Sequence, residues 1–246
     1  MTNLKIPDKR LFTSLFLGPL SKVNDSCVVK ISNRGYSSLL SSVDGSLILY
    51  CNLKQDLETE DVSLNIPDIG RLNKVLQCIE KDGVSLQFND NNISYQSEDI
   101  RFKYHLLEDG IISSPPINID KLKEIEYDTA FEITGQALAN IIKSSTFASE
   151  TDKLYFFTKD EYVYGELTDH QKHNSDSVTR CLSQKFTGTG IIESIPVTFD
   201  VIRIIAGNRA DVIKVLVNNK LSILTFEINT DNIKNIYVVT GLVKTT

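Results

Sequence analysis

The feature that most constrains the fold is one helix-and-strand unit that occurs twice, at an offset of about half the chain. The dipeptide Ile66-Pro67 opens one helical segment, and Ile195-Pro196 opens another. After a short gap, each segment is followed by a hairpin-like pair of apolar runs, over 84–96 and 212–224. A repeat of this kind predicts two similar domains built on the same plan.

Alternating apolar and polar residues, bounded by Asn, Asp and Gly turns, predict antiparallel strands around the repeat. In the first half these strands cover 27–32, 36–43, 46–53, 84–88, 93–96 and 100–106. Four other segments have the apolar spacing of amphipathic helices, namely 8–17, 67–80, 136–147 and 196–206. Two of them are expected to begin with proline in the first turn, where its missing N–H is tolerated. The predicted fold class is α+β, with two helices in each half.

A chain of 246 residues suits two domains of ordinary size. We expect an N-terminal domain, an interdomain connector and a C-terminal domain, over 1–108, 109–128 and 129–246. Two consecutive prolines, Pro115 and Pro116, favour extended backbone in the connector. The connector residues Ile117, Ile119 and Leu122 are interspersed with polar residues. That pattern is compatible with an edge strand and with a solvated linker.

The formal net charge of −6 argues against a protein that coats nucleic acid with its whole surface, so any such contact needs a local basic face. The predicted helices supply one, because their apolar residues share one side and basic residues lie opposite or in the adjoining turn. The residues assigned to this face are Lys9, Arg10, Arg71, Lys74, Lys81, Lys143, Arg203 and Arg209. A lone exposed cation is usually a solvated side chain, so the prediction rests on the agreement of four helices.

Enzymatic function is not expected, because the usual catalytic motifs are absent: there is no GxxxxGK[ST], GxGxxG, GxSxG or HExxH segment. No catalytic residue and no cofactor is predicted. The four cysteines have no CxxC spacing, and His170 and His173 lie in a polar stretch typical of an exposed loop, so no metal site is predicted either. The sequence contains neither a signal-peptide pattern nor an apolar run of membrane-spanning length, which favours a cytoplasmic protein.

Four short segments, in this order and spacing, resemble the DNA sliding clamps, and most closely the trimeric clamps of T-even-type phages. They are 11–15, Tyr95-Gln96-Ser97-Glu98-Asp99, 133–144 and Tyr237-Val238-Val239. The resemblance covers nearly the whole chain. It implies two duplicated clamp-type domains, each with two helices packed on antiparallel sheets.

The same resemblance implies a homotrimeric ring that encircles duplex DNA without reading its sequence and tethers the replicative DNA polymerase. It also implies a clamp-loader ATPase that opens the ring, with transcription factors as further candidate partners and no membrane contact. The protein would then act in the cytoplasm of a bacterium infected by a phage. A monomeric DNA-binding polymerase accessory factor and a β-rich viral structural protein are the alternatives.

The resemblance also implies where the ring closes and where partners bind. Head-to-tail pairing would join strand 101–107 of one copy to strand 178–186 of the next, with Tyr104 and Leu182 in the subunit interface. A partner peptide would lie between the connector and the C-terminal tail, against Ile117, Ile119, Leu242 and Val243. The alternative for Leu242 and Val243 is that they complete the last strand.

Overall fold

The computed structural model describes residues 2–89, 91–113, 115, 117–172 and 174–242. The chain divides into two compact units, which interleave in sequence. The first contains the residues up to Val43, together with Leu49–Ile119 and Thr230–Asn235. The second contains Asp44–Ile48, Asp120–Asn229 and the residues from Ile236 onward. Both consist of a few helices packed on antiparallel sheets, as the predicted fold class requires.

The helices of the first unit begin at two aspartates that occupy equivalent positions. One helix is continuous through α1 (Lys9–Leu11), the π-helical segment η1 (Phe12–Leu17) and α2 (Gly18–Leu20), and the other is α3 (Ile69–Gln77). The Asp8 carboxylate accepts the Leu11 N–H at 2.8 Å, and that of Asp68 accepts the Arg71 N–H at 2.7 Å. Each bond satisfies a backbone donor that has no partner within the helix.

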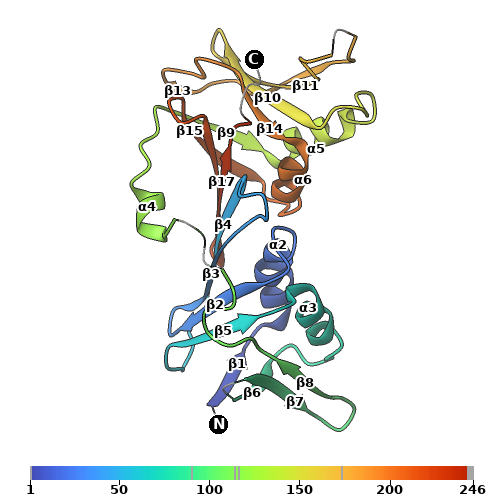
Figure 1. Cartoon of the computed structure of the whole chain (residues 1–246), viewed down its shortest axis with the longest axis vertical. Helices are drawn as coiled ribbons and strands as arrows, with labels where there is room; N and C mark the ends of the chain where they lie inside the picture. The colour runs from blue at the N-terminus through green and yellow to red at the C-terminus, as the bar shows by residue number, and fades with distance from the viewer. Residues whose placement is uncertain (1, 90, 114, 116, 173, 243–246) are drawn as a thin grey trace. The chain divides into compact units, whose positions relative to one another are not determined.

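These helices cover one face of the strands β4 (Leu47–Lys54), β3 (Gly35–Ser41), β2 (Cys27–Ser32) and β5 (Val62–Ile66), which are adjacent in that order (Figure 1). The aromatic core explains the packing. The ring centre of Tyr36 in β3 lies 4.7 Å from that of Phe12 and 6.0 Å from that of Phe16. All three side chains are buried between the helix and the sheet.

A second sheet of the first unit has the order β1 (Thr2–Ile6), β6 (Val84–Asn89), β7 (Asn92–Gln96) and β8 (Arg101–His105). Its buried side chains include Leu4 and Leu86, which are opposite one another in β1 and β6, and Ile93 and Tyr104, which are opposite one another in β7 and β8. Since β8 comes last in the order, it is an edge strand with β7 on one side only.

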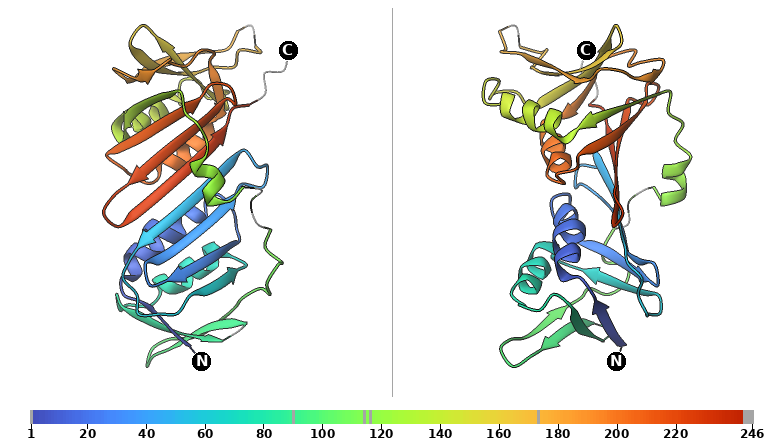
Figure 2. Two further views of the ribbon diagram at one scale, coloured as in Figure 1. Left: turned by 90° about the vertical axis from the view of Figure 1, so that its left-hand side faces the viewer. Right: turned by 180° about the vertical axis from the view of Figure 1, so that it is seen from behind.

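The second unit repeats this plan. Its helices α5 (Gly135–Ser144) and α6 (Phe199–Ala206) pack side by side on one face of a sheet (Figure 2). The strands of that sheet follow the order β13 (Thr187–Gly188), β9 (Thr129–Thr134), β15 (Val212–Asn218), β16 (Ile223–Asn229) and β17 (Ile233–Thr240). A four-stranded sheet has the order β12 (Val178–Ser183), β11 (Tyr162–Leu167), β10 (Lys153–Lys159) and β14 (Ile195–Thr198).

The sequence pattern predicts Pro67 and Pro196 in the first turns of two helices, but in the structure both prolines lie before the helix begins. Pro67 precedes the capping residue Asp68, and α3 begins at Ile69. Pro196 lies in β14, opposite Tyr155, and α6 begins three residues later at Phe199. A proline is tolerated there because β14 is an edge strand, whose outward N–H groups need no ladder partner.

The connector contains a short helix, α4 (Ile119–Lys123), where the alternating pattern suggested a strand or a linker. Asp120 in its first turn and Lys123 in its last complement the helix dipole, and their side chains approach to 3.4 Å. Leu122 is the buried residue of the helix. The Asp120–Lys123 ion pair is exposed, so it contributes little to the stability of the helix. Burial of the Leu122 side chain is the larger stabilising contribution.

We predict that Gly35→Ala lowers the free energy of unfolding by at least about 2 kcal/mol. Gly35 has a φ of 117°, and a Cβ there would collide with the Leu53 carbonyl oxygen and lie 2.8 Å from the Gln55 nitrogen. Gly45→Ala is the matched control: its φ is 71° but no atom lies within 4 Å, so about 1 kcal/mol is expected. Urea unfolding compares the two, and equal losses would contradict the role assigned to the collision.

Candidate nucleic-acid interface

In the first unit, three of the basic residues assigned from the sequence, Arg10, Arg71 and Lys74, are exposed on the helices. Leu72 and Leu76 of α3 are buried, whereas Arg71 and Lys74 are exposed on the opposite side. Arg10 and Lys81 are exposed as well. Within the described part of the chain, no carboxylate lies within ion-pair distance of these four cations, so they are free to meet an anion.

The second unit has a weaker basic face. Lys143 is exposed on α5, opposite the buried Leu138 and Ile141. Arg203 of α6 forms an ion pair with Asp200 at 2.7 Å and lies 4.6 Å from the centre of the Phe199 ring. Its charge is therefore partly compensated within the helix. Arg209 is exposed in the turn after α6.

Lys9 does not belong to this exposed set, contrary to the sequence-based assignment. Its side chain is only 9% exposed, and its amine donates a hydrogen bond to the Ile79 carbonyl oxygen. Ile79 follows the C-terminus of α3, where unpaired carbonyl groups attract a cation. The ammonium group therefore stabilises a helix end and is not available to a phosphate.

Arg180 is a basic residue that the sequence analysis did not select. It lies on β12, and its Nε donates to the Ser144 hydroxyl at the end of α5, at 2.7 Å. The rest of the residue is exposed, so it adds positive charge next to the α5 end. Nothing in the sequence marks this proximity, because it depends on the register that pairs Arg180 with Gly165 of β11.

The two strands expected to join neighbouring copies are both edge strands, since β8 and β12 each end a sheet. The two side chains assigned to that interface point into their own units. Tyr104 is 7% exposed, and its hydroxyl donates to the Asp68 carbonyl oxygen at 2.7 Å. Leu182 is 5% exposed and lies against Gly165. Any contact of these two residues with another chain would therefore use their backbone.

A hollow of about 700 Å³ lies in the first unit, between the outer face of β2 and β3 and the connector; we call it the connector hollow. Ile117 and Ile119, which the sequence analysis assigned to a partner site, line it together with Val28, Leu40, Val43 and Ile111. Lys30 is the one charged side chain among its described lining residues. Six serines and two asparagines also line it, so the hollow offers polar as well as apolar contacts to a ligand.

The residues of the C-terminal tail have a different setting. Leu242 is not among the described residues that line the connector hollow. Its N–H donates to the Pro196 carbonyl oxygen at 2.8 Å within the second unit, and the preceding Gly241 N–H donates to Ser222 at 2.7 Å. Val243 lies outside the described residues. Leu242 lies beyond the end of β17 at Thr240, so it does not complete the last strand, and its described hydrogen bond is to β14.

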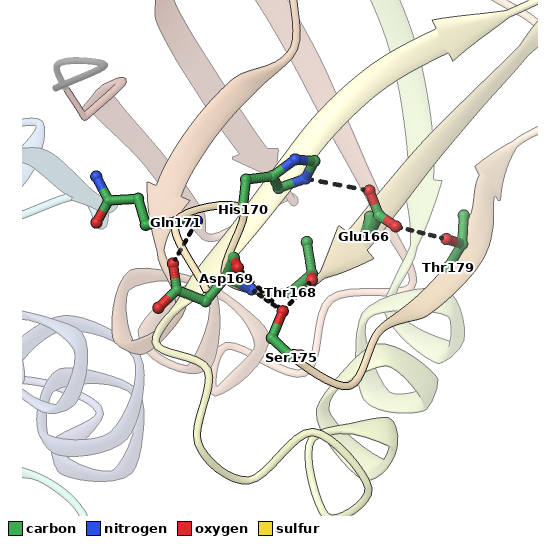
Figure 3. Close-up of polar contacts among 7 residues, drawn as sticks. All are labelled: Glu166, Thr168, Asp169, His170, Gln171, Ser175 and Thr179. Atoms are coloured by element: carbon green, nitrogen blue, oxygen red, sulfur yellow. Dashed lines mark hydrogen bonds and ion pairs between the residues drawn. The ribbon is translucent and has the colours of Figure 1, made fainter. Parts of the chain in front are cut away.

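The loop between β11 and β12 is held by its own polar contacts (Figure 3). His170 Nε2 lies 3.4 Å from a Glu166 carboxylate oxygen, and the imidazole packs 4.1 Å from the Tyr155 ring centre. The Ser175 hydroxyl donates to the Asp169 carbonyl oxygen at 3.0 Å. His173 lies outside the described residues. In the described ranges, no group of three His, Cys, Asp or Glu side chains is arranged to hold a metal ion.

The four cysteines are free thiols, two of them buried and two exposed. Burial raises the pKa of the Cys27 thiol to about 12 and that of Cys51 well above its usual value. Cys78 and Cys181 are the exposed pair. No helix in the described ranges combines the length and apolar character needed to cross a bilayer.

The sequence matches no protein-family model and no curated protein. Its structure is similar over nearly its full length to solved clamp structures. One is the proliferating cellular nuclear antigen (PCNA) of Entamoeba histolytica, with 14% identity, 98% coverage of both chains and a TM-score of 0.76. A second is the PCNA of A. fulgidus, bound to the C-terminal region of FEN-1, with 12% identity, complete coverage of both chains and a TM-score of 0.77.

A third is the PCNA2-PCNA3 complex of Sulfolobus tokodaii, with 11% identity, a TM-score of 0.71, and coverage of 98% of this chain and 99% of that one. Identities this low establish a shared fold and leave activity and partners open. The agreement extends over both halves, so the prediction of two clamp-type domains is confirmed. The chain has the α+β fold of the DNA clamps.

Proposed function

We propose that this chain is a DNA sliding clamp: three copies close into a ring around duplex DNA and tether a replicative polymerase. The observation that carries the proposal is the exposed basic set on clamp-fold helices, in a chain whose net charge is −6. We also infer a phage protein, acting in the bacterial cytoplasm, from the segments that resemble the T-even-type clamps. An enzymatic role is not part of the proposal.

The basic set suits phosphates and not base edges. Spaced lysines and arginines attract the DNA backbone through charge and counterion release, which is independent of sequence. A ring that encircles DNA is retained by topology, so each contact can be weak enough to allow sliding. Four uncompensated cations in one unit and a partly compensated set in the other match that requirement.

We predict that Arg71→Glu, Lys74→Glu and Lys143→Glu together reduce processive synthesis on primed DNA at least about tenfold, because three attractive contacts become repulsive. The measurement is primer extension with the cognate loader and polymerase. A matched control reverses three exposed lysines outside the helices: Lys159, Lys185 and Lys220. Both variants should unfold within about 0.5 kcal/mol of the wild type. Wild-type synthesis by the helix variant would refute the proposed DNA-facing surface.

Ring closure is proposed to use the two edge strands, with β8 of one copy pairing with β12 of the next. Unpaired edges promote association with other chains, and a closed ring satisfies them in a controlled way. The exposed Cys181 on β12 provides a native crosslinking group for this contact. A disulfide forms only when two Cα atoms lie within about 7 Å, so crosslinking reports the pairing directly.

We predict that one of the variants Arg101→Cys, Lys103→Cys and His105→Cys, in a Cys78→Ser background, forms disulfide-linked trimers upon mild oxidation. These β8 residues are exposed on the side of the sheet away from the core, as Cys181 is in its own sheet. Non-reducing denaturing electrophoresis measures the product, and adding Cys181→Ser should abolish it. Monomers from all three variants would refute the pairing and favour the monomeric accessory factor.

The connector hollow is proposed to receive a short hydrophobic peptide of the polymerase or of the clamp-loader ATPase. Ile117 and Ile119 form part of its wall, and the exposed Val43 and Ile111 lie on its lining. A few apolar anchors can supply most of the affinity of such a peptide. The A. fulgidus PCNA structure, which holds the C-terminal region of FEN-1, is a precedent for a terminal segment on this fold.

We predict that Val43→Glu combined with Ile111→Glu lowers polymerase stimulation at least about tenfold while trimer mass is unchanged, because a buried charge opposes an apolar anchor. The two side chains are 94% and 57% exposed, so the fold should tolerate the change. Val212→Glu, at a 51% exposed position in the second unit, is the control. Normal stimulation by the double variant would place the partner site elsewhere.

A further inference from the structure

The sheet side of the connector hollow carries one charged residue, Lys30 of β2. Alternate residues of β2 are buried, namely Cys27, Val29 and Ile31. Since successive side chains of a strand point to opposite faces, Val28 and Lys30 point away from the core. Both residues line the hollow, and Lys30 is exposed. The ammonium group is therefore presented on the same face of β2 as an aliphatic side chain.

Lys30 has a serine on each side of it. The strand register places it opposite Ser37 of β3 and opposite Ser63 of β5, so these three residues form one row on the outer face, which we call the Lys30 row. Ser37 also lines the hollow, and Ser63 is exposed. Hydroxyl groups next to an ammonium group add O–H donors to its positive charge, and this combination suits an anion.

The charge of Lys30 is not compensated within the described part of the chain. No carboxylate there lies within ion-pair distance of its amine, and no acidic residue is among the described lining of the hollow. Asp109, at the start of the connector, has another partner, because its carboxylate accepts the Asn65 side-chain amide at 2.7 Å. The same amide donates to the Leu107 carbonyl oxygen at 3.3 Å. Asn65 thus engages the carboxylate of Asp109 and fixes the connector beside the sheet.

We propose that the connector hollow selects partner peptides that carry an Asp or Glu side chain next to their apolar anchors. The Lys30 row binds the carboxylate, and apolar lining residues such as Leu39 and Ile117 contact the anchors. This assignment rests on the partner site proposed above and adds the chemistry of its occupant. A charge pair beside aliphatic walls is screened less than one in open water, so its sign discriminates between peptides.

A phosphate group fits the hollow less well than a carboxylate. A phosphorylated side chain carries a charge of about −1.5 to −2 at neutral pH, whereas the Lys30 row offers one cation. A nucleic-acid strand repeats a negative charge at every nucleotide and has no aliphatic group to pack against Val28 and Ile117. One carboxylate balances one ammonium group, and its apolar neighbours in a peptide match the walls.

Selection of short random peptides, displayed on phage, against the immobilised full chain tests this proposal. Peptides enriched on the wild type should carry Asp or Glu at a fixed spacing from an aromatic or aliphatic residue. Lys30→Glu should enrich Lys or Arg at that position instead, because it reverses the charge that the peptide must complement. Arg34→Glu, at an exposed position between β2 and β3, is the matched control and should select as the wild type does. Identical peptides from wild type and Lys30→Glu would overturn the proposal.

The selected peptides must also occupy the hollow. Their affinity, measured by fluorescence anisotropy, should fall at least about tenfold in the variant that combines Val43→Glu with Ile111→Glu. Replacing the selected acid by its amide should weaken binding to the wild type about fivefold and leave binding to Lys30→Gln nearly unchanged. Undiminished affinity in the double variant would place the peptides elsewhere. Binding that strengthens about tenfold when phosphoserine replaces the acid would overturn the assignment to a carboxylate.

Primer extension with the cognate loader and polymerase separates this proposal from the partner site on which it rests. Lys30→Glu should lower polymerase stimulation about fivefold without changing the solution mass, and Arg34→Glu should leave both unchanged. If Lys30→Glu stimulates normally and the variant with Val43→Glu and Ile111→Glu does not, the partner site stands and the selection of acidic peptides is wrong. If both variants stimulate normally, the partner site is wrong as well.

Discussion

The structure depends on the burial of one apolar side of each helix against a sheet. Leu72 and Leu76 of α3, and Leu138 and Ile141 of α5, are buried, and burying each such side chain contributes roughly 1.5–3 kcal/mol. That burial fixes the rotation of each helix about its axis. The opposite side must then face outward, and in this chain it carries Arg71, Lys74 and Lys143. Core packing therefore determines where the positive charge lies.

The helix faces could be predicted because they follow from local periodicity alone. Exposed Arg71, Lys74 and Lys143 were identified from a spacing of about 100° per residue, without knowledge of any tertiary contact. Lys9 follows the same local rule, but the prediction that it is exposed is wrong. The end of α3 offers its amine a carbonyl partner that is 70 residues away in sequence. A periodicity argument contains no information about such a contact.

The remaining site features depend on register and on chain crossings. Arg180 reaches α5 only through the pairing of β12 with β11, and the connector hollow exists only because connector residues such as Ile111, Ile117 and Ile119 lie against β2 and β3. Pro196 shows the converse, because a local rule placed it in a helix and the sheet edge accommodates it in a strand.

One residue, Asp68, connects the edge strand to the basic face of the first unit. Its carboxylate caps α3 by accepting the Arg71 N–H, and its backbone N–H and carbonyl group both bond to the Tyr104 hydroxyl of β8. Burial raises the pKa of Tyr104 to about 12, so at neutral pH the hydroxyl keeps the proton that it donates. The start of the helix that carries Arg71 and Lys74 is thereby fixed to the strand proposed to join the next copy. Assembly at β8 and presentation of these cations then share a single structural support.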